Sequence, residues 1–403
     1  MQNYLKNIPS SISKLHKSII VNNAQGSWIY SNCGKKYLDY TSGIGALSTG
    51  HSHPYIVDKI KHQLDKYVHI PQQVFGSHEA QIELNSKLIK KSSSKNLDNI
   101  FYVSTGSEAT DNAIKIARRH TGKKNIITLN KGFHGRTLGA LSITSSNLSC
   151  KLSSQPLIPG IFFCSEDKPN ELDKLLQHQT SPDDTCCFIF ESVQGEGGIN
   201  NINKDFLKYA KEICKKHNIL FIADEVQCGS GRTGAWWNIE LKDIEPDMIT
   251  FGKGIGSGYP IAGVLSSSSI MDCGKNYLGG TYGGNAISSV AASATIDIFE
   301  NENILENCNK MGELLSNNLK NLRNYNKIIE IRQYGLMVGI EFIFSEEPLK
   351  VLELVNNLKE DGILTLLCGN LGQYLRILPP LNTTADEINL FTDKLDKNLD
   401  IFL

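Results

Sequence analysis

Residues 219–227 have the sequence ILFIADEVQ, in which five apolar residues lead directly into two carboxylates, Asp224 and Glu225. A short apolar run rich in β-branched and aromatic residues is typical of a strand buried inside a sheet. A second run of this kind, residues 248–251 (MITF), leads into Lys253, which has a glycine on each side. Both runs lie among longer amphipathic segments, and this alternation predicts an α/β fold with a mainly parallel sheet covered by helices.

The same patterns predict the other elements of the chain. Strands are also expected at residues 99–104, 125–129 and 187–191, and helices at residues 108–120, 204–217, 287–300 and 304–322. After residue 324 the pattern changes, with strands expected at residues 328–333 and 337–344 and a helix at residues 348–361. This change predicts a second, smaller α/β domain.

The chain is expected to have three parts. Residues 28–30 and 36–38 flank a glycine turn, which predicts a hairpin separate from the large sheet and packed partly against the smaller domain. We therefore divide the chain into an N-terminal segment that packs with the small domain (1–50), a large domain (51–300) and a C-terminal small domain (301–403).

The composition excludes several classes of protein. With 41 basic and 42 acidic residues among 403, the net charge is −1. The chain therefore lacks the positive excess that a nucleic-acid binder or a polybasic membrane-surface protein uses. The hydrophobic share of 40% can fill at least one large core and argues against intrinsic disorder. We expect a small-molecule partner, with no nucleic acid and no membrane.

Cysteine spacing and the start of the chain bear on the location of the protein. The ten cysteines contain no C-x-x-C pair, which disfavours both a zinc ribbon and a disulfide framework. The first residues lack the apolar core of a signal peptide, the first forty contain no arginine, and no apolar run reaches the length of about twenty residues that a membrane helix needs. We predict a cytoplasmic location, with an organelle matrix as the alternative.

The segments after the predicted strands carry the candidate site, because open α/β sheets bind ligands beyond the carboxyl ends of their strands. The strand at 99–104 is followed by Gly106 and Ser107 at the start of a helix. Gly106 lets a ligand approach the backbone, Ser107 is expected to be the N-cap, and the helix dipole favours an anion such as phosphate. A helix cap without a ligand is the alternative.

Three further residues at the carboxyl ends of the predicted strands are candidates for binding a cofactor or for catalysis. Phe133, between two glycines, is placed to stack on a planar ring, with a core residue as the alternative. Asp224, after five apolar residues, is expected to lie deep and to need a partner, with a structural cap as the alternative. Lys253 is a candidate for imine formation, because burial lowers the pKa of a lysine. A lysine, a buried carboxylate, an aromatic ring and a phosphate site together match the needs of pyridoxal phosphate.

On these residues the chain resembles the class III, or omega-amino-acid, aminotransferases, in particular the 4-aminobutyrate and acetylornithine aminotransferases. The matching motifs cover nearly the whole length and are YLD at 37–39, GIG at 43–45, GHSHP at 50–54, STGSE at 104–108, FHGRT at 133–137, ESVQGEGG at 191–198, DEVQ at 224–227, TFGKG at 250–254 and RILPPL at 376–381. The resemblance implies a pyridoxal-phosphate enzyme of fold type I. In that fold a large cofactor-binding domain has a mainly parallel seven-stranded sheet between helices, beside a smaller α/β domain.

The resemblance also implies a role for each matching residue. Lys253 is similar to the lysine that forms the imine with pyridoxal 5'-phosphate and moves a proton between the substrate and the cofactor. Asp224 is similar to the partner of the ring nitrogen, and Gln227 to the contact of the ring hydroxyl. The other implied cofactor contacts are Phe133 and Val226 on the two ring faces, His134 beside them, and Gly106 and Ser107 at the phosphate.

Thr281, in the segment LGGTY at 278–282, is similar to a threonine that reaches the phosphate of the neighbouring subunit. This similarity implies a homodimer with shared active sites. No metal site is predicted. His51 and His53 are two histidines without a third ligand, and the resemblance favours turn residues there.

The arginines are few, which makes their positions informative. Only seven of the 41 basic residues are arginine, so an arginine in the cleft is expected to serve for its bidentate geometry toward carboxylates. Arg118, Arg119 and Arg323 lie on helix-like or linker segments and are expected to face solvent. Arg232 and Arg332 lie in turn-like contexts and are expected to be structural. Arg136 and Arg376 remain as candidates for the substrate.

The resemblance assigns these two arginines to substrate carboxylates. In 4-aminobutyrate aminotransferases the residue at Arg136 holds the distal carboxylate, and the residue at Arg376 holds the α-carboxylate of glutamate. With a donor that lacks an α-carboxylate, the second arginine pairs with a glutamate, here Glu196, because a buried guanidinium without a partner is costly. Ile44 matches an apolar wall beside the substrate chain.

We therefore predict the transfer of an amino group from an omega-amino acid, with 4-aminobutyrate favoured, to 2-oxoglutarate. The products are a semialdehyde and glutamate, formed by a ping-pong mechanism.

Three alternatives stay open. Acetylornithine and ornithine aminotransferases share nearly all the motifs, and the departures from the usual pattern at Ser192 and at residues 228–231 and 371–374 bear on the donor. A mutase or racemase of the same fold, such as a glutamate-1-semialdehyde mutase, would keep Lys253 and Asp224 without needing the two arginines and the glutamate. A non-catalytic homologue would be expected to lose Lys253 or Asp224, and both are present.

Overall fold

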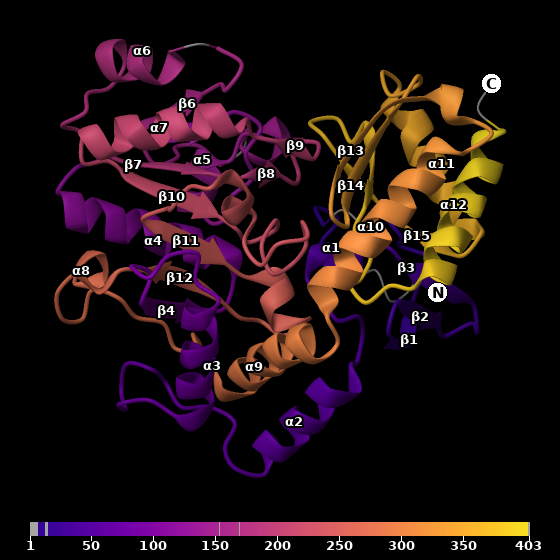
Figure 1. Cartoon of the computed structure of the whole chain (residues 1–403), viewed down its shortest axis with the longest axis horizontal. Helices are drawn as coiled ribbons and strands as arrows, with labels where there is room; N and C mark the ends of the chain where they lie inside the picture. The colour runs from indigo at the N-terminus through magenta and orange to yellow at the C-terminus, as the bar shows by residue number, and fades with distance from the viewer. Residues whose placement is uncertain (1–6, 13–14, 153, 169, 402–403) are drawn as a thin grey trace.

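A seven-stranded sheet is the largest element of the structure, a computed structural model that describes residues 7–12, 15–152, 154–168 and 170–401 (Figure 1). The strand order is β4-β12-β11-β10-β7-β5-β6, and neighbours are parallel except that β12 is antiparallel to β4 and β11. The strands are β4 (Asn99–Val103), β5 (Asn125–Leu129), β6 (Ile161–Cys164), β7 (Thr185–Phe190), β10 (Leu220–Asp224), β11 (Met248–Phe251) and β12 (Ala262–Ser266). The predicted mainly parallel sheet is confirmed.

Two strands of this sheet, β6 and β12, were not predicted from the sequence patterns. β6 has only four residues, and β12 contains the small residues Ala262 and Gly263 in place of a β-branched run. The glycine is required, because a Cβ at Gly263 would lie 2.6 Å from the carbonyl oxygen of Phe101 on the neighbouring strand. Close backbone packing rather than side-chain pattern therefore defines β12.

Helices cover the sheet, and α4, α7 and α9 lie close to the predicted ranges 108–120, 204–217 and 287–300, while α2, α3, α5, α6 and α8 were not predicted. α4 packs against β7, β10, β11 and β12, and α7 packs against β10. The helices of this part are α2 (Pro54–Leu64), α3 (Glu79–Lys90), α4 (Gly106–Thr121), α5 (Leu138–Ile143), α6 (Glu171–His178), α7 (Lys204–Lys216), α8 (Ser268–Met271) and α9 (Ala286–Asn301). The small residues of α9 are buried on most of its surface, which lets α2 and α3 pack closely against it.

The second part of the chain forms a smaller α/β unit, on the right in Figure 1. Its antiparallel sheet has the order β13-β14-β17-β16. The strands are β13 (Ile328–Tyr334), β14 (Met337–Phe342), β16 (Leu366–Cys368) and β17 (Tyr374–Ile377), and the helices are α10 (Ile304–Lys320), α11 (Pro348–Glu360) and α12 (Ala385–Leu399). Arg332 therefore lies in a strand, and the expectation that it lies in a turn is wrong.

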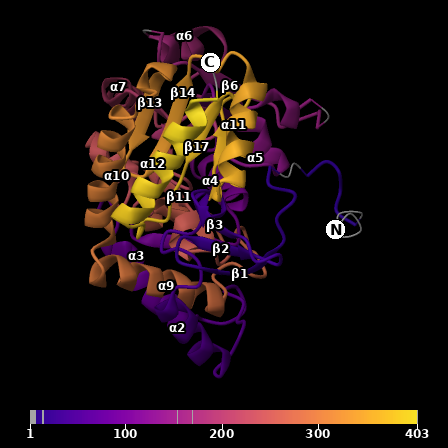
Figure 2. The ribbon, with the colours of Figure 1, turned by 90° about the vertical axis from the view of Figure 1, so that its right-hand side faces the viewer.

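The N-terminal residues form a sheet with a strand from far along the chain. β1 (Val21–Gln25), β2 (Trp28–Ser31) and β3 (Lys36–Asp39) are antiparallel neighbours, and β3 pairs in parallel with β15 (Ile363–Leu364). Figures 1 and 2 both show these strands beside the small unit. The predicted hairpin is present, and β15 joins it to the C-terminal part of the chain.

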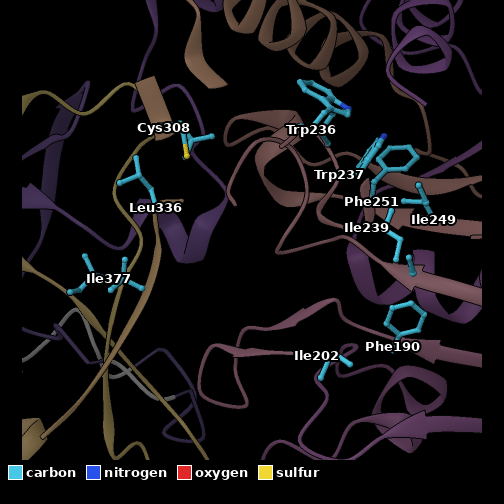
Figure 3. Close-up of a cluster of buried hydrophobic side chains, with 14 of the residues drawn as sticks. Phe190, Ile202, Trp236, Trp237, Ile239, Ile249, Phe251, Cys308, Leu336 and Ile377 are labelled. Carbon is cyan, nitrogen blue, oxygen red and sulfur yellow. The ribbon is translucent and has the colours of Figure 1, made fainter. Parts of the chain in front are cut away.

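One hydrophobic cluster extends through both parts (Figure 3). On the side of the large sheet, Trp237 contacts Trp236 and Phe251 edge-on or at a tilt, and Leu336 and Ile377 belong to the same cluster on the side of the small sheet. The cluster therefore ties the two sheets into one core. Within the described ranges, no helix is both long and apolar enough to span a membrane.

Candidate active site

Lys253 lies at the carboxyl end of β11, near the middle of the large sheet. It is the first residue of the short 3₁₀-helix η3 (Lys253–Gly256) and has φ +47, a left-handed conformation that is strained for a residue with a side chain. Among the described residues, no hydrogen bond or ion pair involves its amine. Burial lowers the pKa of Lys253, which favours the nucleophilic neutral form.

Asp224 ends the neighbouring strand β10, and its carboxylate is fully partnered. Its Oδ2 lies 2.6 Å from Nδ1 of His134, and its Oδ1 accepts hydrogen bonds from the Thr250 hydroxyl at 2.9 Å and the Val226 amide at 3.1 Å. Burial alone would lower the pKa of His134, but the hydrogen bond and charge of Asp224 outweigh it and raise the pKa. The partner expected for a buried carboxylate is thus His134, which is itself buried.

The start of α4 corrects one expectation. The N-cap is Thr105, whose hydroxyl accepts from the Glu108 amide in a capping box, so the prediction of Ser107 as N-cap is wrong. Thr105 and Ser107 lie two positions apart and are both common N-cap residues, so the sequence alone does not distinguish them. Ser107 lies in the first turn instead, and its Oγ accepts from the Arg136 amide at 3.2 Å. The amides of Gly106 and Ser107 have no acceptor within the helix, which suits a phosphate.

Gly106 brings this helix start to the strand ends. A Cβ at Gly106 would lie 2.7 Å from Cγ1 of Val226, so only glycine fits. A Cβ at Gly252 would likewise lie 3.6 Å from Val226 and 3.8 Å from the Cα of Gly106. The start of α4 at Gly106, Val226 and Gly252 therefore lie close together.

Glu191, after β7, connects two turns of the site. Its Oε1 accepts from the Phe133 amide at 2.7 Å, and its Oε2 accepts from the Gly195 amide at 3.1 Å. Burial raises the pKa of this carboxyl to about 7. Sequence patterns give Glu191 no separate role, because its partners are backbone amides 58 and 4 residues away.

Gln227 provides a test of whether the residues fit a pyridoxal ring. Its side chain lies against Gly195, where a Cβ would come within 1.6 Å of its Oε1. That Oε1 is buried and has no hydrogen-bond partner among the described residues. A buried acceptor without a donor, together with the free amine of Lys253, fits a ligand that carries both a hydroxyl and an aldehyde.

Arg376 and Glu196 form a partly buried ion pair at the edge of the site. Nη1 of Arg376, on β17, donates to Oε1 of Glu196 at 2.5 Å, and Arg376 is 3% exposed. Burial would raise the pKa of Glu196, but the charge of Arg376, followed by that of Lys253, lowers it. The small sheet thus contributes Arg376, and the turn at residues 195–198, which follows β7 of the large sheet, contributes Glu196.

A cavity of about 580 Å³ lies beside this pair. Phe133, Arg136 and Glu196 line it, together with residues of the segments 144–150 and 367–372. Arg136 is exposed, and no ion pair of its guanidinium occurs in the described part of the chain. The cavity therefore has one paired arginine beside it and one unpaired arginine in its wall.

Ile44 lies outside the described lining of this cavity. It belongs to α1 (Ser42–Gly45), in which all four residues have positive φ, and it is 49% exposed. The turn is held near the end of β17, because the Ser42 hydroxyl donates to the Leu378 carbonyl at 2.6 Å. The structure therefore places Ile44 near the end of the strand that carries Arg376.

Thr281 and the two histidines lie apart from these groups. Thr281 is exposed, and within the described ranges no hydrogen bond joins it to another predicted cofactor residue. His51 lies 2.9 Å from Asp39, and His53 lies 3.2 Å from Glu302, so the two histidines have different carboxylate partners. The described residues contain no group of three or more His, Cys, Asp or Glu side chains that could hold a metal ion.

Comparison with known proteins agrees with this geometry. The family model of class III aminotransferases matches residues 10–399. The chain is 35% identical to a 5-aminovalerate aminotransferase of Pseudomonas putida, covering 100% of this chain and 96% of the relative. It is 34% identical to an acetylornithine aminotransferase of Archaeoglobus fulgidus (93% and 93%) and 33% identical to a 4-aminobutyrate aminotransferase of Escherichia coli (96% and 95%).

The fold is also similar to that of solved aminotransferase structures. An ornithine aminotransferase of Toxoplasma gondii, with pyridoxal phosphate partially occupying its active site, superposes with a TM-score of 0.88 at 26% identity, covering 98% of this chain and 92% of that chain. The resemblance noted in the sequence is therefore confirmed for family, fold and cofactor. The chain belongs to the class III aminotransferases, and its cofactor is pyridoxal phosphate.

Proposed function

We propose that the protein transfers an amino group from an omega-amino acid, with 4-aminobutyrate favoured, to 2-oxoglutarate in two alternating half-reactions. The observation that carries this proposal is the Arg376–Glu196 pair at 2.5 Å beside a cavity that contains the unpaired Arg136. An omega-amino donor has one carboxylate, which Arg136 can take, and Glu196 neutralises the second arginine. Glutamate and 2-oxoglutarate have two carboxylates and need both arginines.

The cofactor would be held by the groups around Lys253. When bound, pyridoxal phosphate withdraws electrons from the carbon that bears the transferred amino group. Asp224, oriented by His134 and Thr250, would keep the ring nitrogen protonated, and the amides of Gly106 and Ser107 would bind the phosphate. We assign the ring faces to Phe133 and Val226, the ring hydroxyl to Gln227, and the substrate proton to the amine of Lys253.

An acetylornithine or ornithine aminotransferase is the second candidate. Its support is the size of the cavity and the apolar side chains Leu148, Leu367 and Leu371 in its wall, which suit the uncharged acetyl group of N-acetylornithine. A mutase or racemase of the same fold has less support, because it does not require a glutamate paired with Arg376.

We also propose a homodimer, a cytoplasmic location and the division of the chain into residues 1–50, 51–300 and 301–403. The exposed Thr281, without a partner in its own described chain, supports a contact to a second subunit. The ten cysteines are all free thiols, which suits a reducing compartment. Ile44 is proposed to complete the substrate wall when a donor is bound.

A panel of half-reactions tests the donor. Purified enzyme with bound cofactor is mixed with 4-aminobutyrate, 5-aminovalerate, β-alanine, ornithine, N-acetylornithine or glutamate-1-semialdehyde, and the change in the visible absorbance of the cofactor is followed. We expect kcat/KM to be highest for 4-aminobutyrate. A clear preference for N-acetylornithine would replace the first candidate by the second.

Substitution of Glu196 tests the ion pair itself. Glu196→Ala leaves Arg376 unpaired when the donor has no α-carboxylate, so kcat/KM for 4-aminobutyrate should fall about tenfold or more. The half-reaction with glutamate is the internal control and should change by less than about threefold. An equal loss in both half-reactions would remove Glu196 from the proposed function.

A further inference from the structure

The turn that carries Glu196 has little conformational restraint of its own. Residues 195–198 have the sequence GEGG and connect the short strands β8 (Val193–Gln194) and β9 (Asn200–Asn201). Three glycines in four residues give the backbone wide freedom. The 2.5 Å contact between Glu196 and Arg376 therefore requires that other residues fix the turn.

Hydrogen bonds hold the backbone of the turn from two sides, that of the large sheet and that of the small sheet. On the side of the large sheet, the Gly195 amide donates to Glu191 at 3.1 Å. On the side of the small sheet, the Gly369 amide donates to the Glu196 carbonyl at 2.9 Å, and Nη1 of Arg332 donates to the Gly198 carbonyl at 3.0 Å. Among these partners, Glu191 and Arg332 reach the turn through their side chains, and Arg332 is the one that does so from the small sheet.

The guanidinium of Arg332 is held rigidly by its own strand and its neighbours. Its Nε donates to Glu330 at 2.7 Å, and its Nη2 donates to Glu341 at 2.7 Å. Its Cζ lies 4.6 Å from the centre of the Tyr374 ring, which places the cation over the aromatic face. All three nitrogens are thus used, in a planar arrangement that a lysine cannot reproduce.

β17 connects this cluster to the ion pair. Tyr374 and Arg376 are two residues apart on β17 and therefore point to the same side of the sheet. The Tyr374 ring also lies against the end of the turn, since a Cβ at Gly198 would come within 2.9 Å of it. One strand thus presents Tyr374 to Gly198 and Arg376 to Glu196.

We propose that Arg332 is a positioning residue that holds the turn 195–198 so that Glu196 meets Arg376, and that it thereby sets the preference for omega-amino donors over glutamate. The specificity part rests on the proposed function, in which the pair is closed for an omega-amino donor and open for glutamate. With the turn anchored, Glu196 reaches Arg376 without further ordering. With the anchor lost, the closed pair is less populated, while the open state needed by glutamate is not impaired.

Arg332→Lys tests this proposal, with Arg323→Lys as the matched control. Arg323 is also in the small unit and also bridges two carboxylates, Asp396 and Asp400, but it is exposed and is not in contact with the turn. In Arg332→Lys we expect kcat/KM for 4-aminobutyrate to fall about tenfold, with less than about a threefold change for glutamate. Arg323→Lys should leave the ratio of the two half-reactions unchanged.

Hydrogen exchange gives a second measurement that needs no substrate. In enzyme with bound cofactor, peptides that contain residues 195–201 should exchange faster in Arg332→Lys than in the wild type or in Arg323→Lys. Unchanged exchange there would overturn the anchoring role. Faster exchange with an equal loss in both half-reactions would overturn the specificity role.

Failure of the proposed function has a different signature. If the wild type does not accept omega-amino donors, the proposed function fails, and so does the donor preference that depends on it. The anchoring role is then decided by hydrogen exchange alone, because faster exchange at 195–201 supports it and unchanged exchange overturns it.

Discussion

Lys253 is the residue on which the cofactor assignment depends most directly. Its amine has a pKa lowered by burial and no partner among the described residues. Lys253→Ala should therefore lose the visible absorbance of the bound cofactor after dialysis, and transamination should fall by at least about a hundredfold. Borohydride should fix the pyridoxyl group to residue 253 in the wild type only, as peptide mass spectrometry would reveal.

Lys131→Ala is a matched control for this change. Lys131 is also a lysine in the left-handed region, with φ +66, but it is exposed and lies in the turn before Phe133. The control should keep the cofactor absorbance. Persistence of the absorbance after dialysis in Lys253→Ala would contradict the assignment.

The sequence was sufficient for residues that follow a buried strand directly. The positions of Lys253 and Asp224 could be predicted because an apolar run locates each strand and the residues at its carboxyl end lie at the edge of the sheet, while their catalytic roles stay predictions. Glu191 was given no role and Arg332 only a structural one, because their contacts to the Gly195 amide and the Gly198 carbonyl are made to backbone atoms of a glycine-rich turn. Residues of almost every type have a backbone amide and a carbonyl, so the sequence does not indicate which of these groups is bonded, and such contacts are found only in the structure.

At the level of elements, Glu225 joins β10 to the 3₁₀-helix η2 (Asn238–Lys242). Its carboxylate accepts hydrogen bonds from the amides of Asn238 and Ile239 at 2.8 and 2.9 Å. Burial raises the pKa of Glu225 from the ordinary 4.5 to about 7, although these donors oppose the shift. Between these two pH values the folded protein retains a proton that the unfolded chain has released.

This proton sets the direction of a pH dependence. Since the folded state binds more protons in that range, the contribution of Glu225 to the free energy of unfolding falls as the pH rises from 4.5 to about 7, by an amount on the order of 3 kcal/mol. Glu225→Gln cannot titrate, so its stability should fall less over the same range. Urea unfolding of both proteins with saturating cofactor at pH 5 and pH 7.5 measures the difference, and parallel pH profiles would contradict it.

The elements of the large sheet show where pattern-based prediction ends. β5 and β11 agree with their predicted ranges because they are short, mainly apolar runs that contain β-branched residues. β12 was missed because it is antiparallel and must contain Gly263 where the Phe101 backbone approaches. The strand is defined by its neighbours in space, which come from distant parts of the chain.

For the whole molecule, the exposed Thr281 leads to a prediction about shared active sites. If its hydroxyl binds the phosphate in the partner's site, Thr281→Val should weaken cofactor binding about tenfold, and Thr281→Ser should restore it. A mixture of Thr281→Val and Lys253→Ala subunits then contains mixed dimers with one intact site. The mixed dimers alone should then supply about a quarter of the wild-type activity, so subunit exchange should raise the activity of the mixture above the mean of the two variants measured separately.

The mixing experiment distinguishes the two arrangements of the site. If Thr281 serves its own subunit, no mixed dimer has an intact site, and subunit exchange leaves the activity of the mixture at the mean of the two variants. Dimer exchange is verified by mass spectrometry of differently tagged subunits.

The pairing of β3 with β15 has a consequence for synthesis of the chain. Leu38 pairs with Ile363, and 325 residues separate them (363 − 38). A ribosome that adds roughly 5–20 residues per second needs about 15–65 s to make that length. During this time the edge of β3 has no partner strand, and open strand edges are sites of aggregation. The nascent protein therefore leaves this edge of its first sheet open until residue 363 has been added.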